Sequence, residues 1–232
     1  SKFFKFLQTN SLVQHGLSLK RLIKNNNPDL IYSPYTDVIL EINDIPQIIT
    51  CHDLIPLFYP NSRRANWRSK YWLPIHLRRA NKIIAISQNV ADLLINQGFD
   101  HRKIEVVLNG IEEAVDPVLS PLSGDILVVA RHARNKNLLD VIKGYARFIE
   151  MEKTWEGNLI IVGQESRYTL SLKKLTNELK IAARVIWISS LEEEALGKLF
   201  RNSFCLISAS LMEGFDYPLL EAQSIGLPTL AS

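Results

Sequence analysis

Short β-branched and apolar runs alternate with longer amphipathic stretches along most of the 232-residue chain. Runs of this kind, bounded by polar or turn-forming residues, are typical of buried strands, and the stretches between them are long enough to form helices. The pattern predicts strands at 29–33, 47–51, 82–86, 104–108, 126–130, 158–162, 184–188, 204–208 and 228–231.

Helices are expected between these strands. Ser87 is placed to cap one that stops at Gly98, and Pro218 opens another that stops at Gly226. The expected helices span 63–80 (which Pro74 can interrupt), 88–97, 137–151, 168–180, 192–202 and 218–225.

Alternating strands and helices favour an α/β fold with parallel sheets covered on both faces. Residues 111–124 carry Pro117, Pro121 and Gly124 with little periodicity, and are typical of a linker. We therefore expect two doubly wound modules facing each other across a cleft: residues 1–110, the linker 111–124, and residues 125–232. The first module has a surplus of basic residues and the second a surplus of acidic ones.

Composition narrows the class of protein. A net charge of +3 is too small to indicate nucleic-acid binding by itself, and no apolar run is long enough to span a membrane. Two cysteines, Cys51 and Cys205, make no disulfide framework, which favours a reducing compartment. The chain begins with Ser1 and no signal-peptide pattern follows. We expect a cytoplasmic protein that is processed or a fragment.

Ligands of doubly wound sheets bind beyond the carboxyl ends of the strands. The strand at 126–130 is followed by a basic turn that contains Arg131 and Lys136 and leads into a helix. A helix amino terminus favours anions, and these two cations add charge and hydrogen-bond donors. The turn suits a diphosphate, although taken alone it is better explained as a solvated basic turn.

After the strand at 204–208 comes Glu213-Gly-Phe-Asp-Tyr-Pro-Leu-Leu-Glu221. Gly214 lets backbone amides approach a ligand, and both glutamates can accept hydrogen bonds from a hydroxyl-rich one. The alternative is structural: Asp216 or Tyr217 caps the helix, and Glu221 favours the helix dipole.

His52 and Asp53 directly follow the strand at 47–51, where His52 can reach a cleft. Cys51 points to the opposite face, so no Cys-His dyad is expected, and Cys51 is interpreted as a small buried residue. For His52 a structural hydrogen bond is an equally good explanation.

Residues 63–80 combine arginines with tryptophan and tyrosine, which suits contact with anionic lipid headgroups. We favour the simpler interpretation, an amphipathic helix that covers the sheet.

Several other chemistries have no sequence support. The histidines show no metal-ligand spacing with one another or with the cysteines, and no dinucleotide fingerprint, Walker motif or nucleophile elbow occurs. We expect no metal and no cofactor.

Taken together, the motifs resemble those of family 4 retaining glycosyltransferases, which have the GT-B fold of two Rossmann-like domains. Glu213 to Glu221 is similar to that family's Glu-x7-Glu signature, and Arg131 and Lys136 stand at the spacing of its diphosphate-binding pair. His52-Asp53, Asn109-Gly110 and the segment 186–196 are also similar, and the resemblance runs from about residue 28 onward.

The resemblance implies a metal-independent transfer, with retention, of a hexose from a nucleotide-diphosphate sugar to a glycan or lipid-linked acceptor. The acceptor would bind the amino-terminal module, with contact to a membrane surface. Arg131 and Lys136 would stabilise the leaving diphosphate, Glu221 would hold the ribose, and His52, with Asp53 beside it, would contact the sugar. The sugar would be held by Glu213 and by the backbone amides of Gly214, Phe215 and Asp216.

The chain departs from the family at Ala130, Gln164-Glu165 and Ala209, which puts the donor preference in doubt more than the activity. It is also shorter than its family, so we expect either truncation at both ends or a natural short form. Three alternatives follow: a non-catalytic module that binds a nucleotide or a partner, a nucleotide-sugar epimerase, and a glycoside hydrolase. The last needs carboxyl groups roughly 5–9 Å apart.

Overall fold

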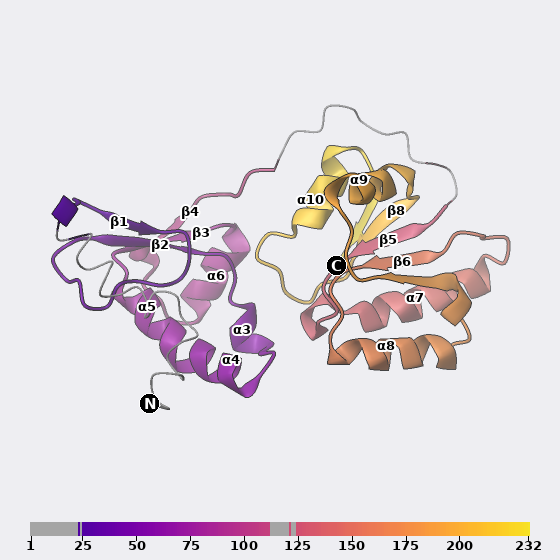
Figure 1. Cartoon of the computed structure of the whole chain (residues 1–232), viewed down its shortest axis with the longest axis horizontal. Coiled ribbons are helices and arrows are strands. Elements are labelled where there is room, and N and C mark those ends of the chain that lie inside the picture. Colours follow the sequence, from indigo (N-terminus) through magenta and orange to yellow (C-terminus); the bar gives the residue numbers. More distant parts are fainter. Residues whose placement is uncertain (1–22, 24, 112–120, 122–123) are drawn as a thin grey trace. The chain divides into compact units, whose positions relative to one another are not determined.

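A computed structural model describes residues 23, 25–111, 121 and 124–232. The chain divides into two compact units, Ser1–Asn109 and Gly110–Ser232. Most of the expected linker, residues 112–120 and 122–123, lies outside the described residues. Each unit contains a parallel sheet, as the alternation predicted (Figure 1). The expectation of a cleft between the modules stays a prediction.

The first unit has four parallel strands in the order β1-β2-β3-β4. They are shorter than expected at several ends, most clearly where the last one stops at Val106 rather than Leu108. The strands are β1 (Ile31–Ser33), β2 (Gln47–Cys51), β3 (Lys82–Ala85) and β4 (Ile104–Val106), and the α-helices are α3 (Ile55–Phe58), α4 (Arg63–Trp67), α5 (Leu73–Arg79) and α6 (Gln88–Asn96). A 3₁₀ turn, His101–Lys103, precedes β4.

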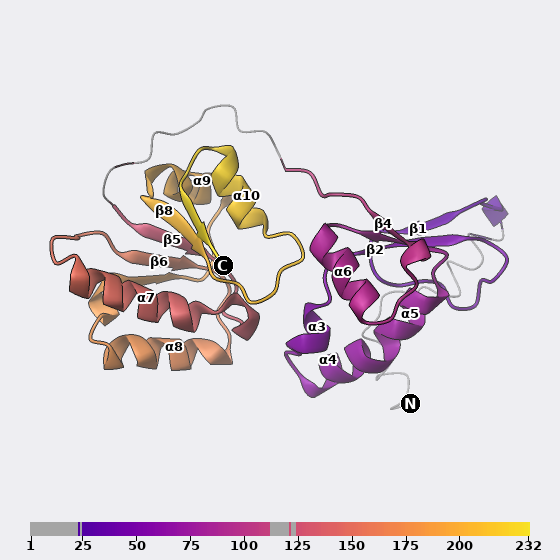
Figure 2. The same ribbon diagram turned by 180° about the vertical axis from the view of Figure 1, so that it is seen from behind.

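The helices α5 and α6 lie on one side of this sheet (Figures 1 and 2). Alternate residues of β3, Ile83 and Ala85, are almost completely buried, as are Leu77 of α5 and Leu94 of α6. Ser87 caps α6 by accepting a hydrogen bond from the Val90 N–H, and Gly98 follows the helix with φ of +81°. Both helix signals in the sequence are thus confirmed.

The helix expected over 63–80 is a continuous helical stretch rather than one interrupted at Pro74. A π-helical turn, Arg68–Trp72, joins α4 to α5, and the Leu73 N–H donates to the Arg68 carbonyl, five residues back. Pro74 then occupies the first turn of α5, directly after the π turn, and has no N–H to donate to the preceding turn. The helix therefore continues past Pro74, with a wider π turn directly before the proline, where the sequence allowed an interruption.

The second unit has five parallel strands in the order β7-β6-β5-β8-β9. The chain starts in the middle, moves to one edge and returns to the other side, which is the doubly wound arrangement. The strands are β5 (Ile126–Val129), β6 (Leu159–Val162), β7 (Val185–Ile188), β8 (Cys205–Ser208) and β9 (Thr229–Ala231), and the α-helices are α7 (Leu138–Met151), α8 (Arg167–Glu178), α9 (Glu193–Asn202) and α10 (Tyr217–Ser224). Short 3₁₀ turns at Arg134–Lys136 and Ala182–Arg184 complete it.

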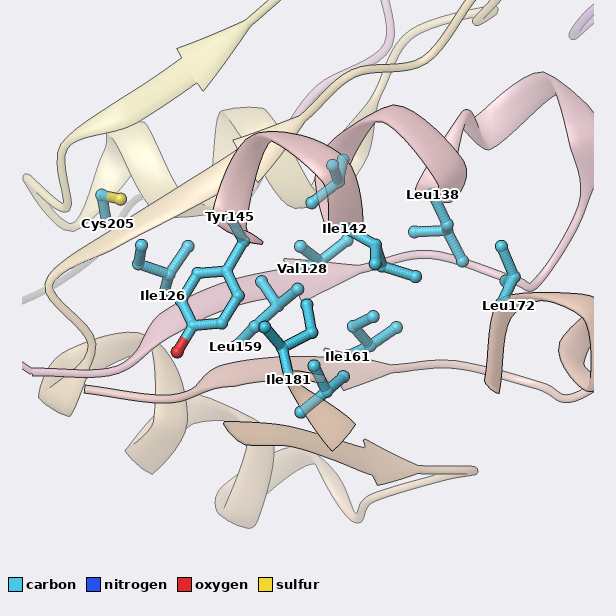
Figure 3. Packing of buried hydrophobic residues seen from close by; sticks show 12 residues of the cluster. Ile126, Val128, Leu138, Ile142, Tyr145, Leu159, Ile161, Leu172, Ile181 and Cys205 are labelled. Atoms are coloured by element: carbon cyan, nitrogen blue, oxygen red, sulfur yellow. The ribbon is translucent and has the colours of Figure 1, made fainter. Parts of the chain in front are cut away.

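Both faces of this second sheet are buried. Ile126 and Val128 of β5 pack with Leu138, Ile142 and Leu172 beneath α7 and α8 (Figure 3). The alternate β5 residue, Leu127, belongs to a second cluster that contains Phe200 of α9 and Ala222 of α10. Strands that are apolar on both faces are expected of a parallel sheet covered on both sides.

The end of β6 passes very close to the end of β5 at Gly163. Its φ is +156°, and a Cβ atom added there would collide with the backbone carbonyl of Ala130. Ala130 N donates to Val162 O at 2.8 Å, and His132 N donates to Gln164 O at 3.0 Å. Gly163 thus allows the turns after the two strands to be bound together.

Gly163→Ala is expected to destabilise the second unit by about 2–3 kcal/mol, because backbone atoms cannot move aside as a flexible side chain can. Gly144→Ala in α7 is the matched control, since no atom lies within 4 Å of a Cβ added there. It should stabilise the helix by up to about 1 kcal/mol. Urea unfolding monitored by circular dichroism measures both. Equal effects of the two substitutions would contradict the close approach at Gly163.

Candidate functional site

Apart from Glu221, which belongs to α10, the candidate site residues of the second unit lie on two loops that leave neighbouring strands. The basic turn follows β5 and the glutamate loop follows β8, and these strands pair in parallel at Ile126–Cys205 and Leu127–Leu206. The chain reverses its direction across the sheet between these two strands, the usual ligand-binding position of a doubly wound sheet. The fold therefore brings both sequence motifs to one edge.

Asn135 ties the two loops together. This residue is 2% exposed and sits in the 3₁₀ turn Arg134–Lys136. Its carbonyl accepts a hydrogen bond from Leu211 N at 2.7 Å, and its side-chain amide donates to Met212 O at 3.4 Å. Asn137 follows with a left-handed backbone, φ of +50°, and starts α7. The basic turn is thus held against the loop that carries Glu213.

Lys136 and Glu213 form an ion pair through Nζ and Oε1. The Lys136 side chain is 13% exposed and that of Glu213 is 20% exposed, so each charge needs compensation. A pair of this kind supplies the compensation within the protein. The family resemblance implies that Lys136 binds a diphosphate and that Glu213 binds a sugar, but it did not predict that the two side chains contact each other.

Arg131 lies in the same turn and is exposed. Its side chain makes no hydrogen bond or ion pair with the residues that the structure describes. Its neighbour His132 is 1% exposed; its Nδ1 hydrogen-bonds Thr169 Oγ1 at 2.8 Å and its carbonyl accepts from Ser166 Oγ at 2.5 Å. Burial lowers the pKa of His132, which keeps the ring neutral. His132 anchors the turn and Arg131 supplies an available cation.

Asp216 stands at the amino-terminal cap position of α10 with a left-handed backbone, φ of +62°. Its side chain does not cap the helix, so that alternative is wrong. The carboxylate instead accepts a hydrogen bond from Ser208 Oγ at 2.5 Å, at the end of β8. Gly214 is buried, and the ring of Phe215 lies 5.1 Å from that of Tyr217. The loop is therefore fixed to the strand it leaves.

Glu221 has the opposite environment to Glu213. It lies beyond the first turn of α10 and is exposed. Partial burial, with a contribution from the nearby Glu193 carboxylate, raises the pKa of Glu221. The dipole effect falls off within the first turn of a helix, and α10 has no acidic residue there, so the interpretation of Glu221 as a dipole-stabilising residue stays a prediction without support from its position. One glutamate has a cation beside it and the other an anion.

A small cavity of about 10 Å³ lies at the carboxyl ends of β5 and β8, lined partly by Lys136, Ser208 and Pro218. It has room for about one water molecule. A ligand of this edge would therefore lie over the loops rather than between the strands.

His52 and Asp53 belong to the first unit. His52 is exposed, and its Nε2 donates to the Pro34 carbonyl at 2.8 Å, so the structural hydrogen bond expected as one alternative is present. Asp53 Oδ1 accepts from Ile55 N at 2.9 Å at the start of α3. Both residues line a cavity of about 330 Å³. Cys51 is completely buried, as expected, and this burial raises the pKa of its thiol to about 12.

No three His, Cys, Asp or Glu side chains within the described ranges gather so that they could hold a metal ion. No helix in that part of the chain is both long and apolar enough to cross a membrane.

Three residues of the second-unit site were not predicted from sequence: His132, Asn135 and Ser208. Each comes at or just after the end of β5 or β8, the positions that a doubly wound sheet marks for attention. Strand ends were therefore the available signal. The roles of His132, Asn135 and Ser208 depend on hydrogen-bond partners elsewhere in the chain, which no local sequence pattern shows.

Two family models match this chain one after the other. Residues 2–115 match the model described as Glycosyltransferase Family 4, and residues 120–232 match the one described as Glycosyl transferases group 1. Together they account for nearly the whole chain.

Curated relatives include the O-antigen chain mannosyltransferase RfbU of Salmonella typhimurium, 26% identical over 94% of this chain and 60% of that protein. The lipopolysaccharide 1,6-galactosyltransferase of the same organism is 28% identical over 81% of this chain and 56% of that protein. The chain thus spans about 60% of the length of these two relatives.

Solved structures with the same fold include sucrose-phosphate synthase from Thermosynechococcus elongatus, with a TM-score of 0.74 and 16% identity over 95% of this chain and 60% of that one. HepE of Anabaena, in complex with UDP and glucose, has a TM-score of 0.71 and 20% identity over 96% of this chain and 64% of that one. At these identities the likeness shows the fold, which is that of GT-B glycosyltransferases.

The raised pKa of Glu221 predicts how stability depends on pH. The folded state holds the proton more tightly than the unfolded state, so the carboxylate destabilises the fold once pH rises through the folded pKa. Glu221→Gln is therefore expected to increase the free energy of unfolding at neutral pH by about 0.5 kcal/mol or less. The gain should vanish at acidic pH, where Glu221 is protonated. Urea unfolding at both pH values measures it.

Glu193→Gln serves as the partner control. It should give part of the same gain at neutral pH, and the double variant should gain less than the sum, because the two carboxylates repel each other. A loss of stability in Glu221→Gln at neutral pH would support the helix-dipole interpretation.

Proposed function

The chain belongs to the family 4, group 1 glycosyltransferases, and on this basis we propose that it moves a hexose from a nucleotide-diphosphate sugar to a glycan or lipid-linked acceptor. The proposal includes retention of the anomeric configuration and independence of metal ions and cofactors. The observation that carries it is the joining of the basic turn and the Glu213 loop at one edge of a doubly wound sheet. The mannosyl- and galactosyltransferase names of the relatives support a hexose.

In the proposed mechanism, the diphosphate of the donor lies over the amino terminus of α7. Arg131 and Lys136 stabilise the negative charge that gathers on the leaving diphosphate, and one donor lost from such a preorganised set typically costs about 3–4 kcal/mol of the barrier. The turn is held by Asn135 and His132, so little reorganisation is needed during the reaction. No metal ion is required, since two cations already face the charge.

The sugar is held by Glu213 and by the backbone amides of Gly214 to Asp216. Lys136 exchanges its bond to Glu213 for the diphosphate, and Glu213 then accepts hydrogen bonds from sugar hydroxyls. Glu221 accepts from the ribose hydroxyls; its side chain is exposed, and its carboxylate has no hydrogen bond to any residue that the structure describes. His52, with Asp53 beside it, contacts the sugar from the first unit.

The alternative, a module that binds nucleotide without transfer, shares these binding residues. The two differ in turnover, which an assay with donor and glycan acceptor measures. The other two alternatives give the glutamates other roles. A glycoside hydrolase, for example, needs a pair of carboxyl groups that act together across one glycosidic bond. The separate environments of Glu213 and Glu221 favour separate roles over a pair acting across one bond.

We also propose contact with an anionic membrane surface at the cytoplasmic face, where a lipid-linked acceptor would be reached. Trp67, Tyr71 and Ile75 recur every four residues on the α4–α5 stretch, and each is about half exposed, at 48%, 53% and 48%. Basic residues accompany them, and Lys70 lies 5.8 Å from the Tyr71 ring centre. A helix that only covers the sheet would not need these three exposed apolar side chains at four-residue spacing.

In a vesicle flotation assay, the chain is expected to float together with vesicles that contain anionic lipid. With vesicles of neutral lipid alone it should remain unbound at the bottom of the gradient. Trp67→Ser combined with Tyr71→Ser should weaken this binding, since each exposed ring supplies apolar area to the interface. Leu170→Ser in α8, where the leucine is 75% exposed, is the control and should leave it unchanged. Equal binding of the double variant and the parent would contradict the proposed contact.

Calorimetry with UDP, GDP and ADP in the presence of EDTA tests the donor site. At least one diphosphate is expected to bind, and Arg131→Gln should weaken it by about 1.5–3 kcal/mol, the value of a hydrogen bond to a charged group. Arg134→Gln, three residues along the same exposed turn, is the matched control and should change affinity little. Loss of binding in EDTA, or equal loss in both variants, would refute the assignment.

Glu213→Gln should act in the opposite direction on free nucleoside diphosphate. Removing the carboxylate frees Lys136 for the ligand, so affinity is expected to rise by up to about tenfold, ~1.4 kcal/mol, while sugar transfer falls. Glu178→Gln, which alters the exposed pair with Lys174, should change neither quantity. A drop in diphosphate affinity in Glu213→Gln would show that Glu213 contacts the nucleotide rather than the sugar.

A further inference from the structure

The β1–β2 connection, residues 34–46, contains no helix and no strand. Parallel strands are usually joined by a crossover that contains a helix, in which backbone groups bond to one another. In this connection Val38, Ile39 and Ile42 are buried, so their backbone groups need partners from elsewhere. The path of the connection therefore depends on side chains that reach it from other elements.

Gln47, at the start of β2, binds the middle of this connection. Its side-chain Oε1 accepts from Ile39 N at 2.7 Å, and its Nε2 donates to the carbonyls of Ile39 and Ile42 at 2.9 and 3.0 Å. Gln47 is itself buried, and its amide does not titrate. These bonds are thus independent of pH.

His76 binds the preceding residue of the connection from α5. It is 3% exposed, and its Nδ1 accepts from the Val38 N–H at 2.9 Å. An accepting Nδ1 carries no proton, so the proton of the neutral ring is on Nε2. That atom is buried without a hydrogen-bond partner among the described residues, 3.9 Å from Asp37 Oδ1. His76 can therefore bind Val38 in this way only as the neutral ring.

Charged groups from two elements face the His76 ring. Burial has the largest effect and lowers the pKa of His76; the Asp37 carboxylate in the β1–β2 connection raises this pKa, and the Arg68 guanidinium in the π-helical turn lowers it. The Trp72 ring packs 5.0 Å from the imidazole and adds no charge. The ring is therefore uncharged at neutral pH, and acid places a proton on the atom that accepts from Val38.

The same connection begins at Pro34, whose carbonyl accepts from His52 Nε2 at 2.8 Å. A carbonyl oxygen can only accept, so this bond keeps a proton on His52 Nε2 and leaves Nδ1 bare in the neutral ring. Val38 follows four residues after Pro34. The bond to His76 thus fixes one end of a short segment, and the other end of that segment orients His52.

We propose that His76 is a positioning residue for His52, an inference that rests on the proposed glycosyltransferase function for the contact of His52 with the sugar. Neutral His76 holds Val38, the segment from Pro34 to Val38 keeps its path, and the Pro34 carbonyl orients the His52 ring. His52 then offers its bare Nδ1 to a hydroxyl group of the substrate. When His76 gains a proton, the segment is released and His52 loses its orientation.

NMR spectroscopy of the labelled chain at neutral pH tests the positioning. Nuclear Overhauser effects are expected between the His52 ring and Pro34, and His76→Leu should abolish them because Val38 loses its acceptor. His76→Asn should keep them, since the Asn Oδ1 stands where Nδ1 stood and accepts from Val38. His101→Leu, at an exposed histidine before β4, is the control and should change nothing.

Acid titration of the parent chain tests the same bond without any substitution. The Val38 amide signal should shift with the same midpoint as the His76 ring, whereas the Ile39 amide, bound to the uncharged Gln47, should shift less. Burial lowers the pKa of His76, so this midpoint should lie below the ordinary histidine value of about 6.5. In His76→Asn the large Val38 shift should be absent.

The acidic end of this titration also separates His76 from His52. A protonated His52 can still donate to the Pro34 carbonyl, so its own titration does not remove the bond. The Overhauser effects between His52 and Pro34 should therefore be lost in the acidified parent and persist in His76→Asn at the same pH. Thermal unfolding of each sample verifies that it is folded.

Two results would overturn the inference. One is a Val38 amide that shifts no more than the Ile39 amide while His76 titrates. The other is a His52 ring that keeps its contact with Pro34 in the acidified parent or in a folded His76→Leu variant.

These measurements need no ligand and no turnover, so they can be separated from the proposed function. UDP, GDP and ADP are titrated into the same samples. Diphosphate binding in a chain whose His52 does not respond to His76 refutes the positioning role alone. A His52 that follows His76 in a chain that binds no diphosphate supports the positioning role and refutes the proposed donor site.

Discussion

The contact between the basic turn and the glutamate loop is the constraint on which the second unit's site depends. Parallel strands present their carboxyl ends at one edge, so the loops after β5 and β8 must share the same small space. Asn135 bonds one loop to the other, and the Lys136–Glu213 pair satisfies two largely buried charges. Without the pair, each charge would be left poorly solvated. Stability and site geometry thus come from the same contacts.

This arrangement has a consequence for ligand binding. With Lys136 bound to Glu213, the exposed Arg131 is the more accessible cation, and the diphosphate of the proposed donor would have to compete with Glu213 for Lys136. In the proposed mechanism, Glu213 would be released from Lys136 in the same step in which the anion is bound. Glu221 lies near Glu193 and has no such compensation inside the described part of the chain. The two ends of the Glu-x7-Glu motif are therefore electrostatically opposite, in accord with different parts of one ligand.

The first unit follows a different principle. Its cavity is built from a strand-end loop and from a helix whose regular spacing is disturbed by one π turn ahead of Pro74. The Trp72 indole N–H, on the same turn, is buried without a hydrogen-bond partner among the described residues. Deviations from regular structure that cost free energy are found where function needs them. The two units thus differ in charge and in what their strand ends offer a ligand.

The sequence by itself determined the alternation of strands and helices, the caps at Ser87 and Gly98, and the two motifs that follow β5 and β8. These depend on hydrophobic periodicity and on residues near one another in the chain, where propensity and capping act. Exact strand ends and the short helix α3 were not predicted, because end residues are weakly specified by local pattern.

Tertiary structure alone decided which side chains meet. Lys136 and Glu213 are 77 residues apart, His132 bonds Thr169 across 37, and Val38 bonds His76 across 38. Such pairings also determine which side chains are buried. Burial lowers the pKa values of His76 and His132, and repulsion from Glu193 contributes to the raised pKa of Glu221. Because charge and hydrogen bonding act through space, a sequence shows which groups are available, and only the fold shows which of them are already used.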